Sequence, residues 1–217
     1  MNFMTPQHAP VPHSGRRGRL PAADRVARRQ FILEAAMAEV IEQGFEQATM
    51  ARIAQRAGAS KETLYAWFSD KNGLVTAIIE ENADRAIEAL QLHLTNDPDR
   101  AEAMQALTGC ARGLLTLLTS PDSIALNRAA MSVPSLAEKL RTSGSGRARP
   151  VIEGYLERLH RLGIINAPDA REAFGVFYGL TIQDTQIRVL LRESPPSSRQ
   201  ITAQADRAVE RFIEVCS

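Results

Sequence analysis

The residues best suited to contact another molecule lie in the stretch TMARIAQRAGASKETLYAWFSDKNGL, residues 49–74. Within it, Ser60, Lys61, Thr63 and Tyr65 bring three hydroxyl groups and one ammonium group together over six positions. Hydroxyl and ammonium groups form hydrogen bonds with phosphate oxygens and with base edges. The stretch therefore predicts contacts with DNA.

Two short helices separated by a glycine are needed to present these side chains. Thr49 caps a predicted helix that runs to Ala57, Gly58 ends it, and Ser60 caps a second helix that runs to about Phe68. Two helices joined by a tight glycine-containing turn form a helix-turn-helix, whose second helix enters the major groove. The residues expected to pack the two helices together are Ile53, Ala54, Ala57 and Leu64.

Hydrophobic periodicity predicts an all-α chain around this motif. One helix precedes it, from Asp24 to Gly44, and a long helix capped by Asp70 follows it to about Thr95. The segment RTSGSG, residues 141–146, is predicted to be a loop, and Pro121 and Pro134 to punctuate the chain. The remaining helices are predicted over residues 99–118, 147–163, 169–193 and 198–216.

This pattern divides the 217 residues into three parts. We expect a disordered basic arm over residues 1–22 and a three-helix DNA-binding domain over residues 23–70. A larger helical domain for ligand binding and dimerisation follows over residues 71–217. Composition adds that no apolar run is long enough to cross a membrane and that no secretory signal begins the chain, so a cytoplasmic location is expected.

Charge is distributed unevenly along the chain. Residues 1–71 carry ten Lys and Arg against seven Asp and Glu, whereas residues 72–217 carry sixteen against eighteen. A basic N-terminal part suggests a polyanionic partner at one end only. The arm residues Arg16, Arg17 and Arg19 are expected either to attract phosphates without sequence preference or to enter the minor groove of A·T-rich DNA.

Catalysis, metal binding and a resident cofactor are not expected. The four histidines are unclustered, and neither a Ser/His/Asp pattern nor a phosphate-binding loop is present. Cys110 and Cys216 have the spacing of neither a disulfide framework nor a zinc site. They are expected to be two unlinked thiols, with redox sensing through Cys110 as the alternative.

The spacing of residues 49–74 resembles the DNA-binding motif of TetR-family transcriptional regulators. The match is Thr49-x3-Ile53-Ala54-x2-Ala57-Gly58-x4-Thr63-Leu64-Tyr65-x2-Phe68-x2-Lys71-x2-Leu74, and the preceding helix with Gly44-Phe45 fits as well. The resemblance covers about residues 25–74. It implies a homodimer with a DNA-binding domain of common fold and a variable helical domain that binds a small molecule.

The resemblance also implies roles for individual residues. Thr49 and Lys71 are expected at phosphates, Tyr65 at a phosphate or sugar, and Ser60, Lys61 and Thr63 nearest the base edges. Glu62 and Trp67 depart from the commonest pattern. Glu62 is expected either to accept a hydrogen bond from a cytosine amino group or to repel a phosphate.

Two DNA-binding candidates have alternative interpretations. Trp67 either packs under the following helix or donates its indole N–H to a phosphate. Arg52 either contacts a phosphate or is a free surface charge. The complete set of DNA-binding candidates is Thr49, Arg52, Ser60, Lys61, Thr63, Tyr65, Trp67 and Lys71, with Arg16, Arg17 and Arg19 of the arm.

The second domain is predicted to dimerise and to bind an effector. Residues 169–193 are apolar on more than one side, so one side is available for a second copy. Residues 147–163 and 169–193 are predicted to form a four-helix dimer interface, which places two recognition helices on a palindromic operator in double-stranded DNA.

By the resemblance, seven residues lie on the helices that enclose an effector, and their character suggests a hydrophobic or amphipathic small molecule. The resulting hypothesis is a ligand-responsive regulator, a repressor that its effector releases from DNA. The alternative is a sequence-specific DNA-binding dimer without an effector. The seven residues are Cys110, Leu114, Asn127, Met131, Tyr155, Phe174 and Tyr178.

Overall fold

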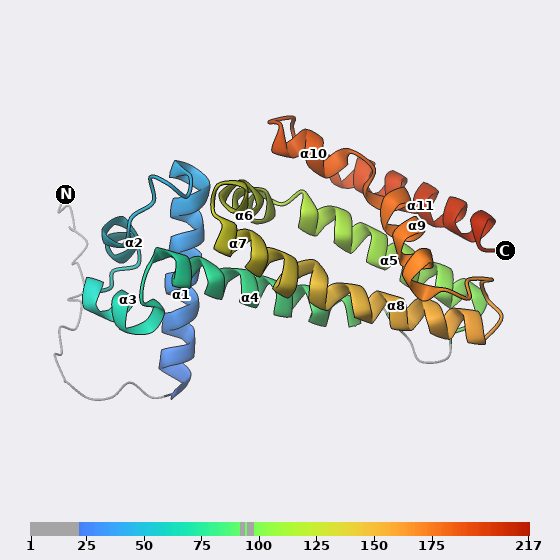
Figure 1. The fold of residues 1–217 in the computed structure, drawn as a ribbon, viewed down its shortest axis with the longest axis horizontal. Helices are drawn as coiled ribbons and strands as arrows, with labels where there is room; N and C mark the ends of the chain where they lie inside the picture. Colours follow the sequence, from blue (N-terminus) through green and yellow to red (C-terminus); the bar gives the residue numbers. More distant parts are fainter. Residues whose placement is uncertain (1–21, 92–93, 95–97) are drawn as a thin grey trace, which may run out of the picture.

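In the computed structural model, residues 22–91, 94 and 98–217 are described, and within these ranges the chain forms helices and no strand. The predicted all-α class is therefore confirmed. Four helices form the N-terminal end of the molecule, and α4 leads away from it (Figure 1). These helices are α1 (Ala22–Gln43), α2 (Met50–Arg56), α3 (Lys61–Phe68) and α4 (Lys71–Gln91).

The remaining helices form the larger, C-terminal part of the molecule (Figure 1). In the ranges that are described, no helix is both long and apolar enough to span a membrane. The elements are α5 (Arg100–Leu118), α6 (Pro121–Ser132), α7 (Pro134–Lys139), the π-helical segment η1 (Leu140–Ser145), α8 (Gly146–Arg161), α9 (Ala170–Ile182), α10 (Thr185–Leu190) and α11 (Ser198–Val215).

The prediction of a loop over residues 141–146 is wrong, because the chain stays helical through η1 from α7 into α8. Thr142 Oγ1 donates to the carbonyl of Glu138 at 2.9 Å, so this polar side chain bonds back to the preceding turn instead of opening a loop. A Cβ added at Gly146 would lie 2.9 Å from the carbonyl oxygen of Arg141, so the glycine permits close passage. The two prolines taken as punctuation each begin a helix, α6 and α7.

The prediction of one helix over residues 169–193 is also wrong, because the chain breaks between α9 and α10. Gln183 has φ +50° and ψ −128°, which ends α9. Gln204 of α11 donates from Nε2 to the carbonyl of Thr181 at 2.8 Å and to Thr185 Oγ1 at 2.9 Å. These two bonds hold the last turn of α9 and the first residue of α10 against α11, and thereby fix the break.

Two hydrophobic cores hold the molecule together, and α4 contributes to both. The first core contains Ile32, Ile53 and Leu64 of the N-terminal helices, together with Leu126 of α6 and Leu136 of α7. The second lies among α5, α8, α9 and α11 and is filled by Leu107, Leu115, Leu156, Phe177 and Phe212. On α4, the first core takes up Leu74, Val75, Ala77, Ile78 and Ile79, and the second takes up Leu90.

The break at Gln183 generates a stability prediction. A non-glycine residue in this backbone region is strained by about 1 to 3 kcal/mol, and glycine removes that strain at the cost of some chain entropy. We therefore expect Gln183→Gly to raise the free energy of unfolding by about 1 kcal/mol in urea titrations. Gln183→Ala is the matched control, because it shortens the side chain but keeps the strain. A Gly variant no more stable than the Ala variant would contradict the prediction.

Candidate nucleic-acid interface

Helices α2 and α3 each begin with the predicted capping interaction. Thr49 Oγ1 accepts a hydrogen bond from the backbone N–H of Arg52 at 3.3 Å, and Ser60 Oγ accepts one from that of Thr63 at 3.1 Å. Gly58, between the helices, has φ +53°, a conformation that favours glycine. The predicted packing residues Ile53, Ala54, Ala57 and Leu64 are all buried.

Helix α3 buries one side and presents the other to solvent. Leu64 is buried, whereas Lys61, Glu62 and Tyr65 are exposed. Thr63 is half-buried, and its hydroxyl lies 2.9 Å from that of Ser60. Hydrogen bonds from its own backbone N–H and from Ser60 lower the pKa of the Glu62 carboxyl. Glu62 is therefore ionised at neutral pH and acts only as an acceptor.

Trp67 packs in part against its own domain, and the contact of its indole N–H with a phosphate stays a prediction. It is half-buried and packs against the first core, and its ring meets that of Phe68 edge-on at 6.3 Å between centroids. Phe68 is buried.

Lys71 makes contacts that sequence reasoning missed. Its Nζ donates to the carbonyl of Phe45 at 2.6 Å and to that of Glu46 at 3.3 Å, and it lies 4.2 Å from the centroid of the Phe45 ring. The side chain thus ties the first residue of α4 to the loop that precedes α2. An ammonium has three N–H donors, so one donor remains for a phosphate.

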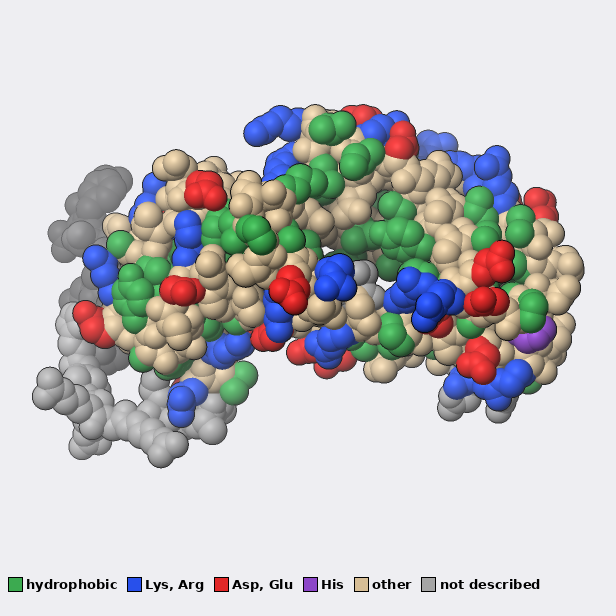
Figure 2. Space-filling model, in the orientation of Figure 1, with side chains coloured by type: hydrophobic (Ala, Val, Ile, Leu, Met, Phe, Trp, Pro, Cys, Tyr) green, Lys and Arg blue, Asp and Glu red, His purple; other side chains and the backbone are tan. Residues whose placement is uncertain are grey.

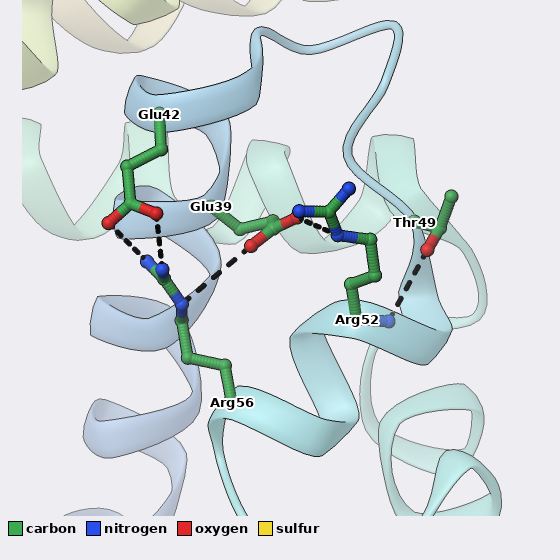
Figure 3. Close-up of polar contacts among 5 residues, drawn as sticks. All are labelled: Glu39, Glu42, Thr49, Arg52 and Arg56. Atoms are coloured by element: carbon green, nitrogen blue, oxygen red, sulfur yellow. Dashed lines mark hydrogen bonds and ion pairs between the residues drawn. The ribbon is translucent and has the colours of Figure 1, made fainter.

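Arg52 is not the free surface charge of its second interpretation, because it is paired with a carboxylate on α1. Its Nε lies 2.6 Å from Oε1 of Glu39 (Figure 3). Arg56 donates from Nη1 to Glu42 Oε1 at 2.9 Å and from Nη2 to Glu42 Oε2, and its Nε lies 3.7 Å from Glu39 Oε2. The hydrogen bond from Arg56 lowers the pKa of Glu42. This cluster joins α2 to the last turns of α1.

Two further residues fix the motif: Arg28, which the sequence analysis missed, and Asp70, which it predicted. Arg28 of α1 donates from Nη2 to the carbonyl of Gly58 at 2.6 Å, so it holds the turn between α2 and α3. Asp70 Oδ1 accepts from the N–H of Gly73 at 2.7 Å, as the predicted cap of α4 requires. A Cβ at Gly73 would lie 2.1 Å from the carbonyl oxygen of Phe68, so α4 begins in close contact with the end of α3. The arm residues Arg16, Arg17 and Arg19 lie outside the described residues.

The predicted effector residues do not share one environment. Cys110 and Tyr155 are buried in the second core, while Leu114, Asn127, Phe174 and Tyr178 are half-buried. Phe174 and Tyr178 stack at 5.7 Å between ring centroids, and the guanidinium of Arg149 lies 5.0 Å from the Phe174 centroid. Met131 is 69% exposed, so it lies on the surface of α6 rather than in the core.

The C-terminal part of the molecule contains a cleft and a separate hollow. The cleft, of about 350 Å³, is lined by Arg100, His160, Gly163, Ile164, Ile165, Asn166, Cys216 and Ser217, and by none of the seven predicted residues. Figure 2 shows a separate hollow between α6 and α9, below α10, with hydrophobic side chains on its wall.

The cysteines are free and buried, as expected for unlinked thiols. Burial raises the pKa of the Cys110 thiol to about 12. Since the thiolate is the reactive form, this environment disfavours redox sensing through Cys110.

Known proteins match both parts of the chain. Residues 32–78 match the family described as bacterial regulatory proteins, tetR family, and residues 105–215 match the AefR-like transcriptional repressor C-terminal domain. The HTH-type transcriptional regulator BetI of Yersinia pestis (strain Pestoides F) is 43% identical over 75 residues, 33% of this chain. The match spans only 38% of the length of BetI.

Solved structures match over most of the chain. A TetR transcriptional regulator from Agrobacterium tumefaciens is 30% identical, with a TM-score of 0.71 over 87% of this chain and 94% of that one. The flavonoid-responsive regulator FrrA is 26% identical, with a TM-score of 0.66 over 88% of this chain and 98% of FrrA.

The contacts of Lys71 generate a prediction about stability. Lys71→Met removes a charged donor from two carbonyls, and hydrogen bonds to charged groups contribute about 1.5 to 3 kcal/mol. Because Lys71 is only half-buried, we expect a loss near the lower end of that range, about 1.5 kcal/mol, in urea unfolding. Lys61→Met, the same change at an exposed position, is the control and should cost less than about 0.5 kcal/mol. Equal losses in both variants would show that the Lys71 contacts do not stabilise the fold.

Proposed function

Because the chain belongs to the TetR family of transcriptional regulators, we propose that it binds a palindromic operator as a homodimer and that a small hydrophobic or amphipathic effector releases it. A regulator of transcription is not an enzyme, in line with the sequence prediction. The observation that carries the proposal is the exposed side of α3, where Lys61 and Tyr65 follow the capping residue Ser60.

We assign the DNA contacts by combining this geometry with the family resemblance. Lys61 reads base edges, because it is exposed at the first turn of the recognition helix. Thr49, Tyr65 and Lys71 contact phosphates or sugars. The hydroxyls of Ser60 and Thr63 bond to each other and to the start of α3, so they contribute less to base reading than Lys61.

The proposed dimer uses the predicted segments 147–163 and 169–193, with the second segment as the main contributor. Ile187 and Leu191, on and just after α10, are exposed apolar side chains, which a partner subunit would bury. The exposed side chains of α8 include the charged Glu157 and Arg161, which suit the polar rim of an interface. A two-fold dimer then carries two α3 helices to half-sites about one DNA turn apart.

The proposed effector site is the hollow between α6 and α9 (Figure 2). Helix α9 carries the stacked, half-buried Phe174–Tyr178 pair, which makes these two residues the candidates for contact with the effector. The similarity to FrrA, described as flavonoid-responsive, supports an effector with aromatic rings. An effector in this hollow alters the packing of the second core and shifts α4, which carries α3 with it. A hundredfold loss of operator affinity requires a preference for the released state of only about 2.7 kcal/mol.

The second candidate is an operator-binding dimer without an effector. It is favoured by the complete burial of Cys110 and Tyr155, two of the seven predicted effector residues, and by the exposure of Met131. Cys110 and Tyr155 pack among the side chains of the second core, and Met131 lies on the surface.

The DNA-binding proposal predicts the outcome of selection from random duplex DNA. We expect the parent protein to recover a two-fold symmetric sequence, and the Lys61→Ala, Tyr65→Ala double variant to recover none. The reason is that the variant loses a base contact and a backbone contact in each subunit. Sequencing of the bound DNA and gel-shift titration measure both results.

Arg112→Ala is the control for this selection, because it removes an exposed cation from α5, far along the chain from α3. It should recover the parent's sequence. Equal, salt-sensitive recovery of any sequence by all three proteins would mean that the exposed side of α3 does not read DNA, and the proposal would fall.

The effector proposal predicts ligand stabilisation and release from DNA. A flavonoid panel, with other hydrophobic and amphipathic compounds, is titrated against the dimer, and the melting temperature and operator occupancy are measured. A true effector raises the melting temperature by mass action and lowers operator occupancy. Phe174→Ala should lose both responses, whereas Leu162→Ala, an exposed apolar position, should keep them. If no compound changes either quantity, the second candidate is preferred.

A further inference from the structure

The buried carboxylate of Glu39 lies between α1 and the arginine side chains of α2. The Glu39 side chain is only 4% exposed, yet it belongs to α1 and faces two arginines of the helix-turn-helix (Figure 3). An isolated carboxylate in such a place is strongly unfavourable, so it requires a cation beside it. Glu39 therefore constrains where the arginine side chains of α2 lie.

The two arginines use their guanidinium groups differently. Arg56 engages all three of its nitrogens, with Nη1 and Nη2 on Glu42 and Nε near Glu39. Among the described residues Arg52 forms one ion pair, from its Nε to Oε1 of Glu39. Figure 3 shows a terminal nitrogen of Arg52 pointing away from Glu39. The Arg52 side chain is 50% exposed and that of Arg56 is 31% exposed.

The terminal nitrogen of Arg52 that points away from Glu39 belongs to the helix expected to cross the DNA backbone (Figure 3). In a helix-turn-helix the first helix crosses the phosphate backbone while the second enters the groove, and α2 is the first helix here. A hollow of about 270 Å³ on α2 is lined by Glu39, Arg52, Gln55 and Arg56. Terminal guanidinium nitrogens suit a phosphate group, which they bind in a bidentate manner.

From this arrangement we propose that Glu39 is a positioning residue for DNA binding: it holds Arg52 by Nε so that its terminal nitrogens receive a backbone phosphate. Arg56 is a structural residue that joins α2 to α1 and contacts no phosphate. The inference rests on the proposed DNA binding and adds the residue that orients one of its contacts.

The opposite role for Glu39 makes a different prediction. If Glu39 only neutralised Arg52, removing the carboxylate would strengthen the attraction to DNA, because one net negative charge would leave each subunit. If Glu39 positions Arg52, removing it weakens binding despite that gain in positive charge. The sign of the change therefore separates the two roles.

The test measures operator affinity as a function of NaCl concentration for the palindromic duplex recovered by the selection. Each phosphate contact contributes about 0.9 to the slope of log K against log salt. We expect Arg52→Ala to reduce the slope of the dimer by about 1.8, one contact in each subunit. We expect Glu39→Gln to reduce both the operator affinity and the slope, as Arg52→Ala does. In a protein that already carries Arg52→Ala, Glu39→Gln should cause no further reduction in either quantity.

Two matched controls accompany these variants. Glu42→Gln makes the same charge change on the same helix but releases Arg56 rather than Arg52, so it should not reduce the slope. Arg56→Ala removes the same type of side chain one helical turn away and should keep the slope of the parent. Thermal unfolding of every variant confirms that the dimer is folded at the temperature of the titration. If Glu39→Gln is unfolded, Glu39→Asp replaces it, because it keeps the charge and withdraws the carboxylate from Arg52.

Each outcome decides the inference. An unchanged slope for Arg52→Ala would show that Arg52 contacts no phosphate, and would overturn it while leaving the proposed function intact. If Glu39→Gln bound the operator more tightly than the parent, Glu39 would not position Arg52. That result would overturn the positioning role and leave the Arg52 phosphate contact standing. Failure of the parent to bind any duplex would overturn both this inference and the proposed function.

Discussion

Helix α4 belongs to both hydrophobic cores, and the rest of the structure depends on that shared membership. Leu74 packs with α1 to α3 in the first core, and Leu90 packs with α5 and its neighbours in the second. The helix has 21 residues and so spans about 30 Å at 1.5 Å per residue. Because packed interiors do not deform continuously, the proposed mechanism has a rearrangement around Leu90 act at the other end of α4, which adjoins α3.

Long-range polar contacts orient the helix-turn-helix within this frame. Helices α2 and α3 have seven and eight residues, too short to be stable alone, so tertiary contacts must hold them. Arg28 holds the turn, Glu39 holds α2 and Lys71 holds the preceding loop. All three come from helices outside the motif. The recognition helix is thus oriented by its surroundings as much as by its own sequence.

The local signals in the sequence predicted the motif, and the long-range contacts could not be predicted. Thr49 and Ser60 mark helix starts because each side chain caps the backbone N–H three residues later. Such a short-range contact can be predicted from the sequence. The break at Gln183 depends on Gln204, a contact that no periodicity reveals. Met131 was expected near an effector because the family resemblance places it on a helix that encloses one, but the resemblance does not give the rotation of α6 against its neighbours, which leaves Met131 exposed.

The first core also contains residues that come much later in the chain. Leu126 and Ala129 of α6 and Leu136 of α7 complete the packing of the DNA-binding helices. A chimaeric regulator that borrowed only residues 22–91 would present this apolar surface to a foreign α6, with mismatched shapes. A chimaera that keeps this core intact therefore takes α1 through α7 together. The DNA-binding helices would then be inherited with α6 and α7, so exchange of the helix-turn-helix alone would leave an unmatched apolar surface.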